Sequence, residues 1–300
     1  ERLYSILEDA TSFFEGGLHS SQEAQEYLKK RGIASETIRD FRIGYIPADW
    51  RLLYTYLLSK KYSDAEIEKA GLAKRAEQKE KGFYDRFRGR VMFPISDSSG
   101  RVIAFSGRIL VDDEKSAKYL NSPDTILFNK STVLYGIDKA KQDIRAKNYT
   151  ILVEGQMDLV LSHQAGIKNT VAVSGTALAD TLTSKENVIN NLGIVRRLSP
   201  NIILAFDSDA AGRKAAMRSA GIALGLGMDV KIADLPEGKD PADLVLANAE
   251  EWKKVLRNAK PVVEFQIDSV MKEADAKKLD ARKIPPLLRE KVLPFILSLD

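Results

Sequence analysis

The sequence of 300 residues predicts an α/β protein in which a parallel sheet flanked by helices follows a mixed α+β segment. From about residue 149 onward, nearly continuous apolar runs alternate with helical patterns. Strands that are buried on both faces of a parallel sheet have this composition. The four apolar runs occupy residues 149–155, 169–175, 201–209 and 229–236. Before residue 130, the sequence instead combines helical patterns with one β-hairpin pattern.

The segments between the apolar runs have helical spacing. They occupy residues 158–164, a stretch from about Leu182, and residues 210–224. Gly166 follows the first segment, where glycine commonly ends a helix. A helix that joins two parallel strands of one sheet makes a right-handed crossover in nearly all proteins. We therefore expect the carboxyl ends of these strands to meet at one edge of the sheet.

The segments on either side of the parallel sheet have different patterns. Residues 23–30 have helical spacing, and Gly32 follows where that helix should end. The runs VMFPI and RVIAF, joined by the turn-forming DSSG at 97–100, predict a hairpin flanked by arginines. The tail after Pro241 is helical and charged. We expect an N-terminal mixed subdomain at 1–129, the sheet domain at 130–256 and a C-terminal helical subdomain at 257–300.

The composition restricts the kinds of site that the chain can form. The absence of cysteine excludes disulfides, thiolate zinc sites and cysteine nucleophiles. His19 and His163 are the only histidines, so no zinc is expected and any metal should be a hard cation held by oxygen. No apolar run is long enough to cross a membrane, and no leader pattern opens the sequence. These features predict a cytoplasmic protein without a membrane partner.

Positive charge is concentrated in one window of the sequence. Residues 74–108 contain nine basic and four acidic side chains, whereas the net charge of the whole chain is only +4. A basic stripe of this kind is typical of a protein that binds a polyanion. A solvated charged surface would explain the charge equally well.

Acidic residues follow three of the predicted strands, where parallel α/β sheets bind ligands. They are Glu154 and Asp158 after the first strand, Asp207 and Asp209 after the third, and Asp240 and Asp243 after the fourth. Two side chains separated by one residue of an extended segment point the same way, roughly 6.6 Å apart. Two carboxylates 4 Å apart repel by about 4 kcal/mol at an effective dielectric constant of 20, so the cluster needs protons or cations. Each acid alone could instead be a helix cap, but three strand ends together favour a Mg²⁺ site.

Three motifs at these acids resemble the Toprim fold. They are EGQMD at 154–158, FDSDAAGRKA at 206–215 and GKDPADL at 238–244. The Toprim domain is shared by bacterial primases, topoisomerases, recombination mediators and some nucleases. The preceding segments resemble, in order, the polymerase domain of bacterial replicative primases. These segments are YLKKRG at 27–32, YDRFRGRVMFPI at 84–95, GRVIAFSGR at 100–108, KYLNSPDT at 118–125 and FNKSTVLYG at 128–136.

The resemblance implies a DNA-dependent RNA polymerase that makes short primers on single-stranded DNA. Glu154, Asp207 and Asp209 match the catalytic metal-site acids, with Asp158 and Asp240 in support. Many relatives read DPD where this chain reads DPAD, so Asp243 ranks below Asp240 as a ligand. The implied cofactor is Mg²⁺, for which Mn²⁺ could substitute. The residues that match those tracking template DNA or nucleotide are Arg31, Arg86, Arg108, Lys118, Asn121 and Lys130.

The resemblance also implies partners. These are a single-stranded DNA template, ribonucleoside triphosphates and the RNA–DNA hybrid product. Members of the family carry a zinc-binding domain before this region and a helicase-binding domain after it. We therefore expect an excised, monomeric catalytic core of a nucleoid-associated protein. In the full-length protein, a replicative helicase and a single-strand-binding protein would be further partners, the helicase through the region that follows.

Other Toprim functions remain as alternatives. A metal-dependent nuclease could use the same acids to activate water. A non-catalytic DNA-binding module of the recombination-mediator type would tolerate loss of these acids, but the principal ones are present. A type IA topoisomerase needs a separate gate domain with a nucleophilic tyrosine, for which 300 residues leave little room. The segment SGT at 174–176 either lines a nucleotide pocket or turns the chain, and His163 is interpreted as structural.

Overall fold

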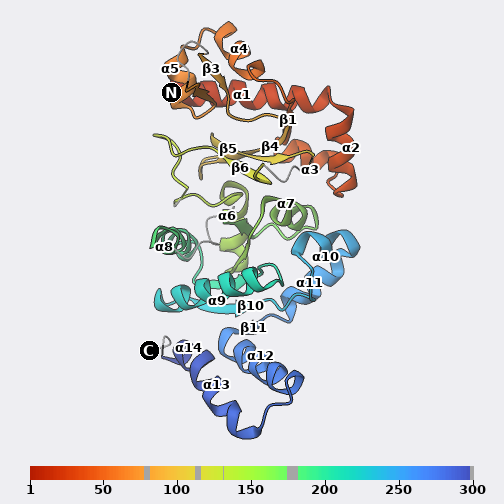
Figure 1. Ribbon diagram of the computed structural model, residues 1–300, viewed down its shortest axis with the longest axis vertical. Coiled ribbons are helices and arrows are strands. Elements are labelled where there is room, and N and C mark those ends of the chain that lie inside the picture. The colour runs from red at the N-terminus through yellow and green to blue at the C-terminus, as the bar shows by residue number, and fades with distance from the viewer. Residues whose placement is uncertain (78–81, 112–115, 131, 174–181, 298–300) are drawn as a thin grey trace. The chain divides into compact units, whose positions relative to one another are not determined.

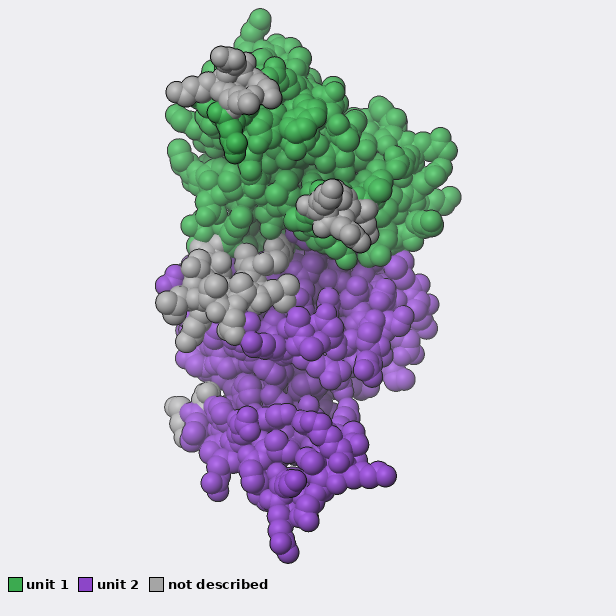
Figure 2. All heavy atoms as spheres, viewed as in Figure 1, with its two compact units in different colours: residues 1–138 green, residues 139–300 purple. Residues whose placement is uncertain are grey.

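The computed structural model describes residues 1–77, 82–111, 116–130, 132–173 and 182–297. The chain forms two compact units, residues 1–138 and 139–300, shown in green and purple in Figure 2. Among the described residues, no helix is both long and apolar enough to cross a membrane.

Unit 1 contains a four-stranded antiparallel sheet in the order β1-β4-β5-β6. Its strands are β1 (Gly44–Ile46), β4 (Arg90–Ser96), β5 (Val102–Ile109) and β6 (Tyr119–Asn121). The predicted hairpin is confirmed as β4 and β5. Asp97 Oδ1 accepts hydrogen bonds from the backbone N–H groups of Ser99 (2.8 Å) and Arg101 (3.1 Å), and Gly100 supplies a positive φ of 89°.

Helices cover this sheet and complete the core of unit 1 (Figure 1). They are α1 (Arg2–His19), α2 (Gln22–Lys30), α3 (Ser35–Asp40), α4 (Leu52–Ser59) and α5 (Asp64–Lys69), with a small hairpin of β2 (Ala73–Arg75) and β3 (Phe83–Asp85). Phe14 of α1 meets Phe105 of β5 edge-on, with ring centroids 5.0 Å apart. Gly17 permits α1 to pack closely against β1, because a Cβ there would lie 2.2 Å from the backbone oxygen of Tyr45. The predicted helix at 23–30 is confirmed as α2.

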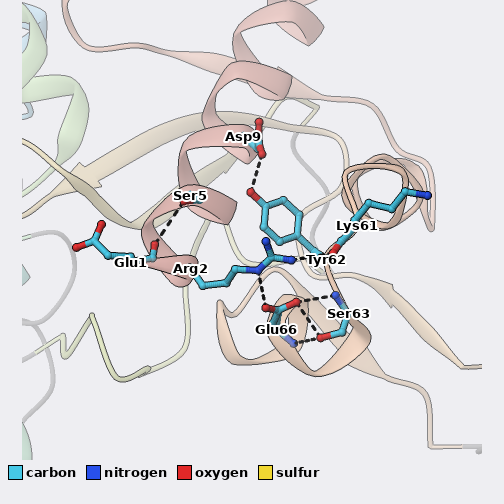
Figure 3. A network of polar contacts seen from close by, with 8 residues as sticks. All are labelled: Glu1, Arg2, Ser5, Asp9, Lys61, Tyr62, Ser63 and Glu66. Carbon is cyan, nitrogen blue, oxygen red and sulfur yellow. Dashed lines mark hydrogen bonds and ion pairs between the residues drawn. The ribbon is translucent and has the colours of Figure 1, made fainter.

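A polar network ties α1 to the segment that begins α5 (Figure 3). Arg2 donates from Nε to Glu66 Oε1 and from Nη2 to the backbone oxygen of Lys61, both at 2.8 Å. The Tyr62 hydroxyl donates to Asp9 at 2.7 Å. Ser63 and Glu66 form a reciprocal capping box, so α5 starts at a fixed point beside α1.

Unit 2 contains a five-stranded sheet in the order β11-β10-β9-β7-β8. Strands β7 (Thr150–Val153), β8 (Thr170–Ala172), β9 (Asn201–Leu204) and β10 (Asp229–Ile232) are parallel, whereas β11 (Lys260–Pro261) pairs with β10 in the antiparallel direction. The four predicted strands and the flanking helices are therefore confirmed. The antiparallel edge strand was not predicted, because two residues carry no recognisable β pattern.

The helices of unit 2 flank the sheet and extend to the end of the chain (Figure 1). They are α6 (Ile137–Lys147), α7 (Gln156–Gln164), α8 (Leu182–Arg196), α9 (Ala210–Gly225), α10 (Pro241–Ala247), α11 (Ala249–Arg257), α12 (Val262–Ala276), α13 (Ile284–Lys291) and α14 (Leu293–Ile296), with a 3₁₀ turn at Ala281–Lys283. His163 is buried in α7, where Nε2 contacts the backbone oxygen of Thr170 at 2.9 Å and burial lowers its pKa to about 4. This environment supports its structural interpretation.

Candidate active site

Two neighbouring strands of unit 2 bring acidic residues to the same edge of the sheet. Glu154 directly follows β7, and Asp207 lies three residues after the end of β9, which pairs with β7 in parallel. Glu154 Oε1 accepts a hydrogen bond of 3.0 Å from the backbone N–H of Asp207. The structure thus places residues 53 positions apart in the chain in direct contact.

The electrostatics of Glu154 reflect this crowding. Burial, together with the negative charges of Asp207 and then Asp209, raises the pKa of Glu154 to about 7, against the lowering effect of the Asp207 N–H bond. A carboxyl group in this environment binds a proton unless a cation offsets the neighbouring charges. The local charge therefore favours a positively charged ligand.

Asp209 occupies the start of α9. It is the N-cap residue, and its Oδ1 accepts a hydrogen bond of 2.7 Å from the backbone N–H of Gly212. Gly212 also faces Glu154. A Cβ at this position would lie 2.3 Å from the backbone oxygen of Asp207 and 2.7 Å from Glu154 Oε1. Only glycine lets the first turn of α9 approach the acidic edge this closely.

Asp158 is buried beneath the same edge and is only 7% exposed. Its Oδ2 accepts from the backbone N–H of Gly155 and its Oδ1 from that of Ala242, both at 3.1 Å. Burial raises its pKa well above the ordinary value, and the charges of Asp240 and Asp207 add to the rise. Asp158 therefore joins the first turn of α7 to the first turn of α10.

Asp240 and Asp243 lie at the start of α10. Asp240 is its N-cap residue, and Oδ1 accepts from the backbone N–H of Asp243 at 2.6 Å. Ala242 is buried and holds Asp158 through its backbone N–H. The side chain of Asp243 is half-buried.

The donor set at this edge suits a hard divalent cation, since it consists of carboxylate oxygens. Within the described part of the chain, no three acidic or histidine side chains converge tightly enough to hold a metal ion as they stand. Glu154 instead contacts the backbone of Asp207, and Asp209 caps its helix. The charge of a bound cation would compensate the repulsion that raises the pKa of Glu154.

Several of the predicted nucleic-acid residues gather around β6 in unit 1. Arg86 donates from Nε (3.1 Å) and Nη2 (2.7 Å) to the backbone oxygen of Asn121. Arg108, directly across from Tyr119 in the β5–β6 register, donates to the Tyr119 hydroxyl at 3.0 Å. Lys118 precedes β6, and its side chain is exposed. The structure brings these four predicted residues together on one sheet edge.

Tyr27 connects α2 to this edge. The guanidinium carbon of Arg108 lies 5.7 Å from the centre of the Tyr27 ring, and Arg31 follows Tyr27 by one helical turn. The Nε atoms of Arg31 and Arg108 are buried and donate to no acceptor among the described residues. A negatively charged oxygen from a ligand would satisfy such donors.

Lys130 lies in the loop beyond β6. Its backbone N–H donates to Asp124 Oδ1 at 3.1 Å, and its side chain is half-buried. This bond links Lys130 to the loop that follows β6.

The basic window at 74–108 is only partly a surface feature. Arg90 is buried and donates from Nη1 to the backbone oxygens of Gly107 (2.9 Å) and Ala117 (3.0 Å). Arg86 and Arg108 are likewise bonded within unit 1. Charge counted along the sequence therefore overstates the charge available to a partner. Lys79, Glu80 and Lys81 lie outside the described residues.

Comparisons with known proteins address both units. The family model described as the DNA primase catalytic core, N-terminal domain, matches residues 13–141, and the model described as Toprim-like matches residues 151–245. A DNA primase of Clostridium acetobutylicum is 37% identical over 278 residues, which cover 92% of this chain and 44% of the relative. The chain thus spans less than half the length of this curated relative.

Solved structures decide the family. The RNA polymerase domain of Mycobacterium tuberculosis primase DnaG matches with a TM-score of 0.83 and 31% identity, covering 100% of this chain and 94% of that one. The chain belongs to the DnaG primase family. A DnaG primase catalytic domain bound to single-stranded DNA also matches, with a TM-score of 0.80, 33% identity, and coverage of 99% and 90% of the two chains. The fold class and the family predicted from the sequence are confirmed.

Gly212 is not among the site residues predicted from the sequence, although it lies within the motif FDSDAAGRKA. Gly212 lies inside a helical pattern, where glycine normally destabilises the structure. That unusual placement, three residues after Asp209, was the available signal for a close approach. The segment SGT at 174–176, predicted to line a nucleotide pocket or turn the chain, lies outside the described residues.

Proposed function

We propose that this chain is the catalytic core of a primase that synthesises short RNA primers on single-stranded DNA. The contact between Glu154 and the backbone of Asp207, at an edge where burial and neighbouring acids raise the pKa of Glu154, is the observation that carries the proposal. A polymerase needs a divalent cation at the reacting phosphate, and this edge concentrates the ligands for one. Curated relatives from Clostridium acetobutylicum and Pseudomonas aeruginosa are named DNA primases.

The acids have different roles in this proposal. Glu154, Asp207 and Asp209 bind Mg²⁺, which Mn²⁺ can replace. When bound, the cation lowers the pKa of a ribose 3′-hydroxyl and neutralises the pyrophosphate leaving group. Asp158 and Asp240 support this site from the starts of α7 and α10, where both accept backbone hydrogen bonds. Asp243 ranks as an additional ligand candidate.

The residues around β6 hold the template and the nucleotide in this proposal. Lys118 is exposed and suited to a phosphate, whereas Arg31 and Arg108 offer buried Nε–H donors. Arg86 positions Asn121 through two hydrogen bonds to its backbone oxygen, and Lys130 provides a further positive charge. Phosphate contacts of this kind give binding that depends on salt and only weakly on sequence.

The proposed partners follow from this chemistry. The chain would bind single-stranded DNA, ribonucleoside triphosphates and the RNA–DNA hybrid that it forms. The similar DnaG catalytic domain bound to single-stranded DNA supports the first of these. We further propose a cytoplasmic, nucleoid-associated protein. The full-length protein would also work with a replicative helicase and with a single-strand-binding protein.

The test incubates the protein with single-stranded DNA, Mg²⁺ and one labelled ribonucleoside triphosphate among all four. Labelled RNA oligomers that require the template support primase activity. Shortened DNA without labelled RNA would instead support a Toprim nuclease. DNA binding without either product would support a non-catalytic module.

A further inference from the structure

A pocket lies at the edge of the unit 2 sheet opposite the acidic cluster. Its volume is about 490 Å³, within the range of roughly 300–1,000 Å³ that is usual for ligand sites. Tyr149, Asn201 and Asp229 line it, and they stand at the starts of β7, β9 and β10. Along β7, Tyr149 and Glu154 are separated by roughly 16 Å of extended chain. The pocket is therefore distinct from the proposed metal site.

The floor of the pocket is aliphatic. It contains Ile167, Ile202, Ile203 and Leu256, each of which is at most 9% exposed. Apolar side chains that line a concavity without filling it favour an apolar group from a ligand.

The rim of the pocket is positively charged. Its lining residues include four cations and one acid, which are Lys147, Lys231, Lys253, Arg257 and Asp229. Lys147 pairs with Asp143 of α6 at 3.5 Å, and Lys253 pairs with Glu250 of α11 at 2.7 Å. Exposed pairs of this type contribute only about 0.2–1 kcal/mol, so an incoming anion can replace them. The charge of the rim favours an anionic ligand.

The local backbone offers no cradle for a compact phosphate. Phosphates are often held by backbone N–H groups at helix N-termini, but the helices that reach this pocket do so with their C-terminal residues, Lys147 of α6 and Arg257 of α11, so an anion here must be bound by side chains. The side-chain amides of Asn148 and Asn201, which could recognise a nucleotide base, already form hydrogen bonds within the protein. Asn201 Nδ2 donates to the backbone oxygen of Asn148, and Asn148 Oδ1 accepts from the Ser199 hydroxyl. In contrast, carboxylates spaced along a peptide match the four cations spaced around the rim of this pocket.

We propose that this pocket docks an acidic peptide segment of a partner protein. An apolar side chain of the segment enters the aliphatic floor, and flanking Asp or Glu residues pair with the rim. Positively charged surfaces steer such segments and select them by charge, while the apolar anchor supplies most of the affinity.

The test uses a fluorescent peptide, Asp-Asp-Leu-Asp-Asp-Leu-Asp-Asp, and fluorescence anisotropy without Mg²⁺. Lys231→Glu and Arg257→Glu should each weaken binding roughly tenfold, since each replaces an attraction with a repulsion. Lys254→Glu is the matched control, because Lys254 is exposed on the same helix as Arg257 but does not line the pocket. Its affinity should stay within about twofold of the parent protein.

Further comparisons with a variant peptide, with ATP and with primer synthesis make the outcome decisive. Replacing both leucines of the peptide by serine should weaken binding roughly tenfold, because the aliphatic floor then has no anchor to bury. Equal effects of all three charge reversals, or equal binding of the serine peptide, would show a nonspecific basic surface and overturn the proposal.

Displacement of the peptide by ATP in the parent protein, but not in Arg257→Glu, would overturn it in favour of a nucleotide site. Primer synthesis by Lys231→Glu at the parent level separates this proposal from the polymerase function.

Discussion

The charged residues of the two units are held in different ways. In unit 2, adjacent parallel strands bring acids together at one edge, and Glu154 contacts Asp207 through the backbone. In unit 1, Arg86 and Arg108 are tied by hydrogen bonds to their own unit, whereas the side chain of Lys118 is exposed. Topology therefore gathers like charges in unit 2 that favour binding of a proton or a cation, whereas the arginines of unit 1 are already partly paired. Removing single residues should affect the two regions very differently.

The largest effect is expected for Asp207→Asn. It should lower RNA synthesis by at least two to three orders of magnitude, since a neutral amide is a poor ligand for the cation that the reaction needs. DNA binding, measured by anisotropy, should be unchanged or slightly stronger because one negative charge is lost. Asp234→Asn, at an exposed position of the same unit, is the control. Unchanged synthesis by Asp207→Asn would contradict the metal assignment.

The next effect concerns the close approach of α9. Gly212→Ala should reduce the free energy of unfolding by about 1–3 kcal/mol and lower synthesis, because its Cβ would overlap Asp207 and Glu154. Gly221→Ala, on the same helix, meets only Phe295 at 3.9 Å and should raise stability by up to about 1 kcal/mol. Urea unfolding of both variants measures the difference. Equal stability changes in the two would mean that the helix does not press on the acidic edge.

A smaller effect follows from the raised pKa of Glu154, which is about 7 in the folded protein. Between its ordinary value near 4.5 and pH 7, the unfolded chain has released this proton while the folded protein retains it. The free energy of unfolding of the metal-free protein should therefore fall as pH rises through this window, by on the order of 2 kcal/mol. Urea unfolding in EDTA at pH 5 and pH 8 measures the decline.

Glu154→Gln should make this pH dependence shallower, whereas Glu251→Gln, at an exposed position, should leave it unchanged. Part of the slope should persist in Glu154→Gln, because the pKa of Asp158 is raised as well. The same slope in Glu154→Gln and the parent protein would show that Glu154 is charged throughout.

The smallest effect is expected in unit 1. Lys118→Ala should weaken binding of single-stranded DNA by a few-fold and reduce the slope of log K against log salt by about 1, as loss of one phosphate contact predicts. Lys69→Ala, exposed on α5 of the same unit, is the matched control. A salt slope unaltered by Lys118→Ala would exclude a phosphate role for this lysine.

The sequence was most informative where residue type and topology coincide. Glu154, Asp207 and Asp209 end apolar runs, and parallel strands necessarily deliver such residues to one edge. The hairpin of β4 and β5 was equally predictable, because Asp97 and Gly100 form a local turn. These features depend on short-range rules.

Other features depend on contacts that the sequence does not encode locally. The partners of Asp158 include Ala242, 84 residues away, so its structural bonds could not be foreseen. The burial of Arg90 depends on carbonyl groups of two other segments, which made the basic window appear more exposed than it is. The basic pocket between the strand starts arises from residues spread over more than a hundred positions.

The central claim is that Glu154, Asp207 and Asp209 together bind the divalent cation used in RNA synthesis. Diffraction from crystals soaked with Mn²⁺ and a ribonucleoside triphosphate tests it most directly, because anomalous scattering locates the metal. The account predicts a manganese peak in direct coordination with carboxylate oxygens of these three residues and with the nucleotide phosphates. A manganese ion bound elsewhere, with Glu154 still bonded only to the Asp207 backbone, would contradict it.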